Sequence, residues 1–260
     1  MLLSARFRPC RVRGRSDHGV HDDLAGILTL VSRLLVMRTV RHIACAAALG
    51  ACMAPVAVSQ PTTSLRQPSA AALAAQGPDS FTVRISTTQG AVTVIARRAW
   101  APRGSDRFFH LVRLRFYDKS MFYRVLPNYI AQVGYHRDPA VTTAWDELAI
   151  KDDKRGQSNK KGSVTFARAG ANSRTTQLFF NLADNTNLDP LGFTPFAEVT
   201  EGMEALAALN GEYGEIFPRG NGPKAARVAL EGNAYLKKAF PKLDGIDSAR
   251  IVERWPPAKR

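Results

Sequence analysis

One short stretch of the sequence places an arginine and a glutamine among aromatic and aliphatic residues. Arg124, Tyr129, Ile130 and Gln132 lie within nine residues of one another. Two strands joined by a turn at 127–128 would bring these four side chains to one face of a sheet, where a guanidinium could donate hydrogen bonds beside an apolar surface. The spacing also fits an arginine in a surface ion pair beside an ordinary strand pair. From the residues alone, both interpretations stand.

The body of the chain, taken as residues 79–254, lacks the residues that several other kinds of active site require. All three cysteines (Cys10, Cys45 and Cys52) precede residue 60, which excludes thiol catalysis and cysteine-based zinc sites from the body. Its two histidines, His110 and His136, have no partner at a ligand-like spacing. The sequence contains no GxSxG, P-loop or dinucleotide-binding motif. It therefore predicts no metal and no cofactor, and neither hydrolysis nor hydride transfer.

Most of the elements predicted to position Arg124, Tyr129, Ile130 and Gln132 are short strands. Apolar and polar residues alternate over 81–86 and 91–96, which predicts a hairpin around the Gln89-Gly90 turn. Further strands are predicted at 122–125, 129–133, 163–167, 177–182, 196–199 and 249–253. Many short strands with two or three helices are typical of an antiparallel barrel or sandwich covered by helices.

Three helices and one charged loop complete the prediction. Ser105 is expected to cap the first helix and Thr200 the second. The third begins at Pro223 and is stopped by Pro241. The charged segment 151–162 is predicted to be a solvated lid or surface loop and not a ligand site.

Three sequence blocks resemble the cyclophilin-type peptidyl-prolyl cis-trans isomerases. Residues 122–134 look like the family signature F-x-R-x-x-P-x-[FY]-x-x-Q-x-G. Residues 162–181 are similar to the family's A-x-A-G…Q-F-F core, and residues 188–203 resemble its loop and strand before the second helix. The blocks occur in order with sensible spacing, and the resemblance covers residues 81–252.

The resemblance implies a fold and an activity. The fold would be mostly β, a closed eight-stranded antiparallel barrel capped by two helices, with an extra C-terminal helical insertion typical of a bacterial branch. The activity would be rotation about X-Pro peptide bonds, with proline-containing polypeptides as substrates and no metal or cofactor. A monomer is expected.

The resemblance also assigns roles to residues of this chain. Arg124 and Gln132 would be catalytic: Arg124 would donate a hydrogen bond to the prolyl region, and Gln132 would bind a substrate carbonyl. The expected substrate-binding residues are Tyr129, Ile130, Ala167, Arg168, Phe179, Leu188 and Phe193. The backbone of Ala167 and Arg168 would pair with the substrate main chain, as an added strand does.

Five positions depart from the best-known members of the family. Tyr129 replaces a phenylalanine, Ile130 a methionine and Arg168 an asparagine. Asn187 stands where some members have a tryptophan, and Phe193 where many have a histidine. Because the tryptophan would donate a hydrogen bond to cyclosporin, its loss predicts weak binding of that drug.

The segment before the body resembles an export signal. Arg38 and Arg41 precede an apolar stretch that ends at Ala57-Val58-Ser59, so residues 37–59 are predicted to be a signal peptide. Leu49-Gly50-Ala51-Cys52 also resembles a lipobox, in which Cys52 would carry a lipid anchor. Cleavage after Ser59 and lipidation at Cys52 both imply export to the periplasm or outside the cell. An uncleaved or cytoplasmic form is a third possibility. Residues 1–36 are interpreted as a mis-assigned or disordered extension, 60–78 as a flexible linker and 255–260 as a C-terminal tail.

The charge of the chain bears on its partners. The formal net charge is +14, of which +5 precedes residue 60. The basic residues of the body are scattered among acidic ones, so no nucleic-acid partner is predicted. The favoured function is an isomerase that assists the folding of exported proteins. The alternative is a catalytically weak chaperone that binds peptides in the same groove.

Overall fold

The computed structural model describes residues 64–255. The predicted extension, the predicted signal peptide and the three cysteines lie outside the described residues. No helix within 64–255 is long and apolar enough to cross a membrane.

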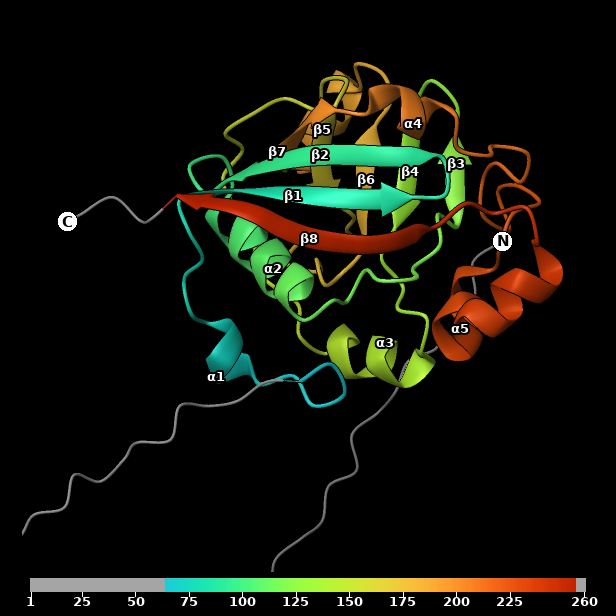
Figure 1. Cartoon of the computed structure of the whole chain (residues 1–260), viewed down its shortest axis with the longest axis horizontal. Helices are drawn as coiled ribbons and strands as arrows, with labels where there is room; N and C mark the ends of the chain where they lie inside the picture. The colour runs from blue at the N-terminus through green and yellow to red at the C-terminus, as the bar shows by residue number, and fades with distance from the viewer. Residues whose placement is uncertain (1–63, 256–260) are drawn as a thin grey trace, which may run out of the picture. The chain divides into compact units, whose positions relative to one another are not determined.

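Eight antiparallel strands form one sheet around the main hydrophobic core (Figure 1). Their bounds are β1 Ser80–Thr87, β2 Gly90–Arg97, β3 Arg124–Leu126, β4 Ile130–Val133, β5 Ser163–Phe166, β6 Leu178–Asn181, β7 Pro195–Glu201 and β8 Ile246–Trp255. The order across the sheet is β3-β4-β6-β5-β7-β2-β1-β8. The largest buried side chains include Trp145, Tyr117, Phe81, Phe108, Phe116, Phe122, Phe166, Phe180 and Phe196. The predicted mostly-β fold with eight antiparallel strands is confirmed.

The predicted closure of the barrel is wrong, because the ladder is open between β3 and β8. These strands are the two ends of the sheet order. The chain just before β3 meets the start of β8 only at an isolated bridge between Met121 and Gly245. Its hydrogen bonds run from Phe122 N to Asp244 O (2.9 Å) and from Ile246 N to Ser120 O (2.8 Å). With only three residues in β3, the two edges meet at one point, and the sheet is curled but open.

The first long helix, α2 (Pro102–Arg113), begins four residues earlier than a helix capped by Ser105 would, and Ser105 does not cap it. The Ser105 hydroxyl is buried and has no hydrogen-bond partner among the described residues. Asp153 instead accepts from the backbone N–H groups of Arg103 (3.0 Å) and Gly104 (2.9 Å) at the start of the helix. A carboxylate at this end is favoured because free N–H groups and the helix dipole both attract negative charge.

The remaining helices also differ from the predictions in detail. The second predicted helix is α4 (Met203–Ala207), which follows Gly202, because Thr200 still belongs to β7. The predicted C-terminal helix is α5 (Ala225–Ala239), with a kink at Gly232. The helices α1 (Ala70–Leu73) and α3 (Pro139–Asp146) and the 3-10 helix η1 (Thr186–Leu191) were not predicted.

Within the predicted flexible linker 60–78, the described part is a packed segment. Leu65 and Leu73 contact the main core. The Leu65 carbonyl accepts from Trp145 Nε1 at 3.0 Å, and the Ala75 carbonyl lies 2.8 Å from His110 Nε2. Residues 64–78 therefore belong to the folded domain. The sequence did not predict this packing, because two isolated leucines and two backbone carbonyls leave no periodic pattern.

Candidate active site

A tight hairpin carries the two residues predicted to be catalytic. The strands β3 and β4 are antiparallel, and Arg124 is the direct partner of Gln132. The connecting turn contains Asn128 with φ +59°, a conformation that asparagine tolerates better than most residues. The pairing places both side chains on one face of the sheet, as predicted.

The Arg124 guanidinium is held by two side chains. Its Nη1 donates to Gln132 Oε1 at 3.0 Å, and its Nη2 donates to Glu215 Oε2 at 2.6 Å. The arginine side chain is only 14% exposed, and its Nε has no partner within residues 64–255. Sequence reasoning left open a surface ion pair or a site arginine. The structure contains an ion pair, but in a largely buried position at the predicted site.

Gln132 is itself held by a chain of polar contacts. Its Nε2 lies 3.4 Å from Gln177 Oε1, which also accepts from the Tyr123 hydroxyl at 2.5 Å. Burial raises the pKa of Tyr123 well above its ordinary value, so this hydroxyl stays protonated and acts as a donor. The contacts fix the orientation of the Gln132 amide, with its oxygen toward Arg124.

An apolar surface lies beside these polar groups. Ile130, Phe179 and Leu188 form a separate buried cluster. Tyr129, Ala167 and Phe193 are partly buried and pack against it, and the Phe179 and Phe193 rings meet edge to face with centroids 5.6 Å apart. Phe179 is the register partner of Gln132 on β6, which joins the apolar cluster to the polar pair.

All nine predicted site residues line one cavity of about 440 Å³. Sequence reasoning missed three other lining residues, Ala169, Ile216 and Arg219. Ile216 and Arg219 come from the segment that also supplies Glu215. No spacing pattern indicated this segment, because Glu215 follows Arg124 by 91 residues.

The predicted solvated loop 151–162 supports one wall of the cavity. Its buried Asn159 donates from Nδ2 to Asp189 (2.8 Å) and to the Phe193 carbonyl (2.9 Å). Asp189 also accepts from the Ser158 hydroxyl at 2.5 Å. Burial tends to raise the pKa of Asp189, but these hydrogen bonds outweigh it and lower the pKa below the ordinary value. The loop thus fixes η1, which carries Leu188.

Arg168 acts through its side chain as well as its backbone position. Its Nη1 donates to the Gly192 carbonyl and its Nε to the Gly170 carbonyl, both at 2.9 Å, and its Nη2 lies 3.2 Å from Asp152. One guanidinium therefore connects three loops around the cavity.

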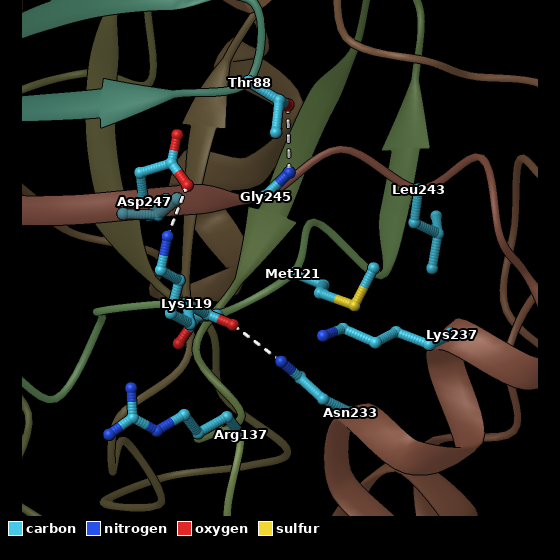
Figure 2. A pocket seen from close by; sticks show the side chains of 11 residues that line it. Thr88, Lys119, Met121, Arg137, Asn233, Lys237, Leu243, Gly245 and Asp247 are labelled. Atoms are coloured by element: carbon cyan, nitrogen blue, oxygen red, sulfur yellow. Dashed lines mark hydrogen bonds and ion pairs between the residues drawn. The ribbon is translucent and has the colours of Figure 1, made fainter.

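A second cavity, of about 610 Å³, lies at the open seam of the sheet (Figure 2). In it, Lys119 Nζ lies 2.8 Å from Asp247, and Asn233 on α5 donates to the Lys119 carbonyl at 2.7 Å. None of the nine predicted site residues lines it. In the described part of the chain, no three His, Cys, Asp or Glu residues gather closely enough to hold a metal ion.

Comparison with known families shows the family to which the chain belongs. The model of the family described as cyclophilin type peptidyl-prolyl cis-trans isomerase/CLD matches residues 82–225, more than half of the chain. The chain belongs to this cyclophilin-type family. The predicted enzyme class, peptidyl-prolyl cis-trans isomerase, is therefore confirmed.

Individual cyclophilins resemble the chain over most of their own length. Peptidyl-prolyl cis-trans isomerase A of Dickeya dadantii is 29% identical over 162 residues, which cover 60% of this chain and 85% of that protein. Peptidyl-prolyl cis-trans isomerase CYP18-2 of Arabidopsis thaliana is 31% identical over 133 residues, which cover 49% of this chain and 79% of that protein. A solved cyclophilin type isomerase of Cryptosporidium parvum shares the fold, with a TM-score of 0.50 at 18% identity, covering 67% of this chain and 99% of that one.

Proposed function

We propose that this isomerase acts on X-Pro bonds in the cavity around Arg124, and that its substrates are proline-containing segments of exported proteins. The observation that carries the site assignment is the position of Arg124. Its guanidinium is largely buried and fixed at 3.0 Å from Gln132, beside the apolar cluster of Ile130, Phe179 and Leu188.

The chemistry needs no covalent intermediate. Rotation about a peptide bond has a barrier of about 18–20 kcal/mol, because resonance gives the C–N bond partial double-bond character. X-Pro bonds therefore isomerise in tens to hundreds of seconds without a catalyst. As the bond twists, resonance is lost and the proline nitrogen recovers its lone pair. A donor at that nitrogen stabilises the twisted state more than the planar one, which is the requirement for catalysis.

Arg124 is suited to be that donor. A guanidinium has five N–H groups, and Gln132 and Glu215 accept one from each terminal nitrogen. A second N–H on each of these nitrogens remains for the substrate. Because the group is fixed in a partly dry site, it stabilises developing charge more strongly than it would in water.

The other residues would bind the substrate. Tyr129, Ile130, Phe179 and Leu188 would hold the proline ring, with Phe193 at the rim. The backbone of Ala167 and Arg168 would pair with the substrate main chain, and Gln132 would donate to a substrate carbonyl through its amide nitrogen.

A protease-coupled proline-peptide assay on the full chain tests this assignment. We expect Arg124→Ala to lower kcat/KM by roughly 100-fold, since a charge-assisted contact made in the twisted state is lost. Arg84→Ala, at an exposed position on β1, is the matched control. Circular dichroism would verify that both variants are folded. An unchanged rate for Arg124→Ala would refute the mechanism.

The same variants separate the enzyme from a catalytically weak peptide-binding chaperone. For the enzyme, Arg124→Ala should lose turnover while a proline peptide still perturbs the NMR signals of residues around the groove. For the chaperone, the wild-type chain itself would bind the peptide without accelerating its isomerisation.

Export is proposed from residues 37–59, which have the sequence of a secretory signal. Mass spectrometry of the mature protein would distinguish an N-terminus at Gln60 from a lipidated Cys52. An intact N-terminus on protein recovered from the cytoplasm would contradict export.

A further inference from the structure

The one carboxylate in contact with Arg124 within residues 64–255, that of Glu215, belongs to a segment that sequence reasoning did not assign to the site. Glu215 lies between Gly211 and Lys224, after α4, and its Oε2 is 2.6 Å from Arg124 Nη2. We propose that Glu215 is a positioning residue for Arg124, and that the C-terminal insertion containing α5 holds Glu215 in place. This inference rests on the proposed role of Arg124.

Glu215 is well placed to orient the guanidinium. Its carboxylate is 23% exposed and Arg124 is 14% exposed, so the pair is partly shielded from water. The other oxygen, Oε1, accepts from the Ile216 backbone at 2.9 Å and lies 3.8 Å from Arg219. Burial tends to raise the pKa of Glu215, but the hydrogen bond and charge of Arg124 outweigh it and lower the pKa. The carboxylate is therefore charged at neutral pH and is not free to swing away.

Gln132 and Glu215 hold the guanidinium from two sides. Gln132 accepts from Nη1 and Glu215 from Nη2, so the two contacts together fix the rotation of the planar group. Without Glu215, only the neutral Gln132 contact would remain, and Arg124 could rotate about its side-chain bonds. Loss of one fixed orientation matters because a small misplacement of a reacting group slows catalysis strongly.

The backbone around Glu215 is closely packed. The Glu215 carbonyl accepts from Gly222 N at 2.9 Å. A Cβ added at Gly222 would lie 2.7 Å from that carbonyl oxygen, and one added at Gly220 would lie even closer, so both positions require glycine. Gly211 packs against Pro127 in the β3–β4 turn, where an added Cβ would lie 2.7 Å from Pro127 Cγ. The segment is thus fitted to the hairpin that carries Arg124.

The insertion supplies a second hydrophobic core beneath this segment. Its buried residues are Tyr123, Val228, Tyr235, Leu236 and Leu243, with Ile216, Tyr213 and Phe240 packed against them. The rings of Tyr213 and Tyr235 each meet the Phe240 ring edge to face, with centroids 5.1 and 5.7 Å away. The segment is therefore attached through Tyr213 and Ile216 to the core that α5 forms.

The position of α5 relative to the family match agrees with this role. The match ends at residue 225, where α5 begins, so the helix lies outside the part of the chain that the family model describes. The same core contains Tyr123, the residue before Arg124, which donates to Gln177 in the polar chain behind Gln132. The insertion thus contacts the segment with Glu215 directly, and it contacts Tyr123, which is linked to Gln132 through Gln177.

Substitution of Glu215 tests the proposal in the full chain. We expect Glu215→Ala to lower kcat by roughly tenfold or more with little change in KM, because the contact orients the donor and does not bind substrate. Glu215→Gln keeps the size and one acceptor oxygen, so it should retain more activity than alanine. Glu212→Ala is the matched control, because Glu212 lies in the same segment and pairs with Lys242 at 2.9 Å, away from Arg124.

A double variant distinguishes positioning from a general structural effect. In an Arg124→Ala background, Glu215→Ala should cause no further loss, whereas a structural defect would add its own. A Glu215→Ala enzyme as fast as wild type, while Arg124→Ala is slow, would overturn this inference and leave the proposed function intact. An increased rate would also overturn it, since the contact would then be inhibitory. If Arg124→Ala itself had no effect, the proposed role of Arg124 would be refuted, and with it the basis of this inference.

A remote substitution tests the role of the insertion. Phe240→Ala removes the ring that contacts both Tyr213 and Tyr235, and it should lower kcat in the same direction as Glu215→Ala. In a Glu215→Ala background it should have no further effect on kcat. Leu230→Ala, on the helix that Phe240 ends, is the control, because this side chain is 73% exposed. Unchanged kcat for folded Phe240→Ala would refute the supporting role of the insertion.

Discussion

Arg124 and Gln132 face each other as register partners across the β3–β4 hairpin, and Nη1 of the arginine donates to Oε1 of the glutamine at 3.0 Å. The contact uses the amide oxygen of Gln132 and leaves its nitrogen 3.4 Å from Gln177. In the proposed mechanism the glutamine therefore has two tasks: it fixes the guanidinium and presents an amide donor at the edge of the cavity. Its effect on catalysis should exceed that of one hydrogen bond to substrate alone.

Replacement of Gln132 should slow the enzyme without unfolding it. Gln132→Ala removes a hydrogen bond to a charged group, worth about 1.5–3 kcal/mol, so kcat/KM should fall by roughly 10- to 100-fold. The measurement is the protease-coupled assay, with the exposed Gln157→Ala as control. A loss of less than about twofold would mean that Glu215 alone suffices to orient Arg124.

Replacement of Arg168 should act mainly on substrate binding. Arg168→Ala removes the hydrogen bonds to the Gly170 and Gly192 carbonyls and frees the loop after η1. Because Leu188 lies on η1 and Arg124 is untouched, we expect KM to rise by about 3- to 10-fold while kcat changes little. Steady-state kinetics with a proline peptide would measure both constants. A fall in kcat with constant KM would contradict this role.

The buried ion pair at the start of α2 should dominate local stability. Asp153 and Arg174 are almost fully buried, with Oδ2 and Nη1 at 3.1 Å, and Asp153 also accepts from two N–H groups of the helix. Asp153→Asn would remove the fully buried counter-charge of Arg174 and leave only the partly exposed Asp152, whose Oδ1 is 3.6 Å from Arg174 Nε, so it should lower the free energy of unfolding by about 3 kcal/mol.

Urea unfolding followed by circular dichroism measures this loss. The control is Asp247→Asn, which breaks the exposed pair with Lys119 and should cost less than about 1 kcal/mol. Equal losses for the two variants would show that burial of the Asp153 pair has no special effect.

The accuracy of sequence reasoning depended on how far apart the interacting residues are in the chain. Arg124, Gln132 and Ile130 were found because one hairpin contains them, and Phe179 because a family motif marks it. Glu215 was missed, since it reaches Arg124 from 91 residues away through a turn-rich segment without periodicity. The predicted cap of α2 was wrong for a similar reason.

For the start of α2, local rules predict the nearby Ser105 as the cap, whereas the carboxylate that accepts from the helix N–H groups belongs to Asp153, some fifty residues later. The closed barrel was wrong because closure depends on the hydrogen bonds of a few residues near Met121 and Gly245, which no pattern in the sequence specifies. Contacts that are both remote in sequence and few in number therefore lie beyond prediction from patterns.

Mild acid should weaken the attachment of residues 64–78. His110 is buried beneath this segment with its Nε2 at 2.8 Å from the Ala75 carbonyl. Burial lowers the pKa of His110 below its ordinary value of 6.5, and it outweighs the hydrogen bond to Ala75, which raises the pKa. The unfolded chain then binds more protons than the folded one as the pH falls below about 6.5. The stability contributed by neutral His110 is complete above that pH and is lost as the pH drops toward the lower folded pKa.

Unfolding by urea between about pH 5 and 7 would show this loss as a falling free energy of unfolding. In His110→Gln the side chain can still donate to Ala75 but does not titrate, so the slope should decrease. It should not vanish, because burial also lowers the pKa of His136. Limited proteolysis within residues 64–78 should become faster at low pH in the wild type, and less so in His110→Gln. An identical pH dependence in both proteins would show that His110 does not control the docking of this segment.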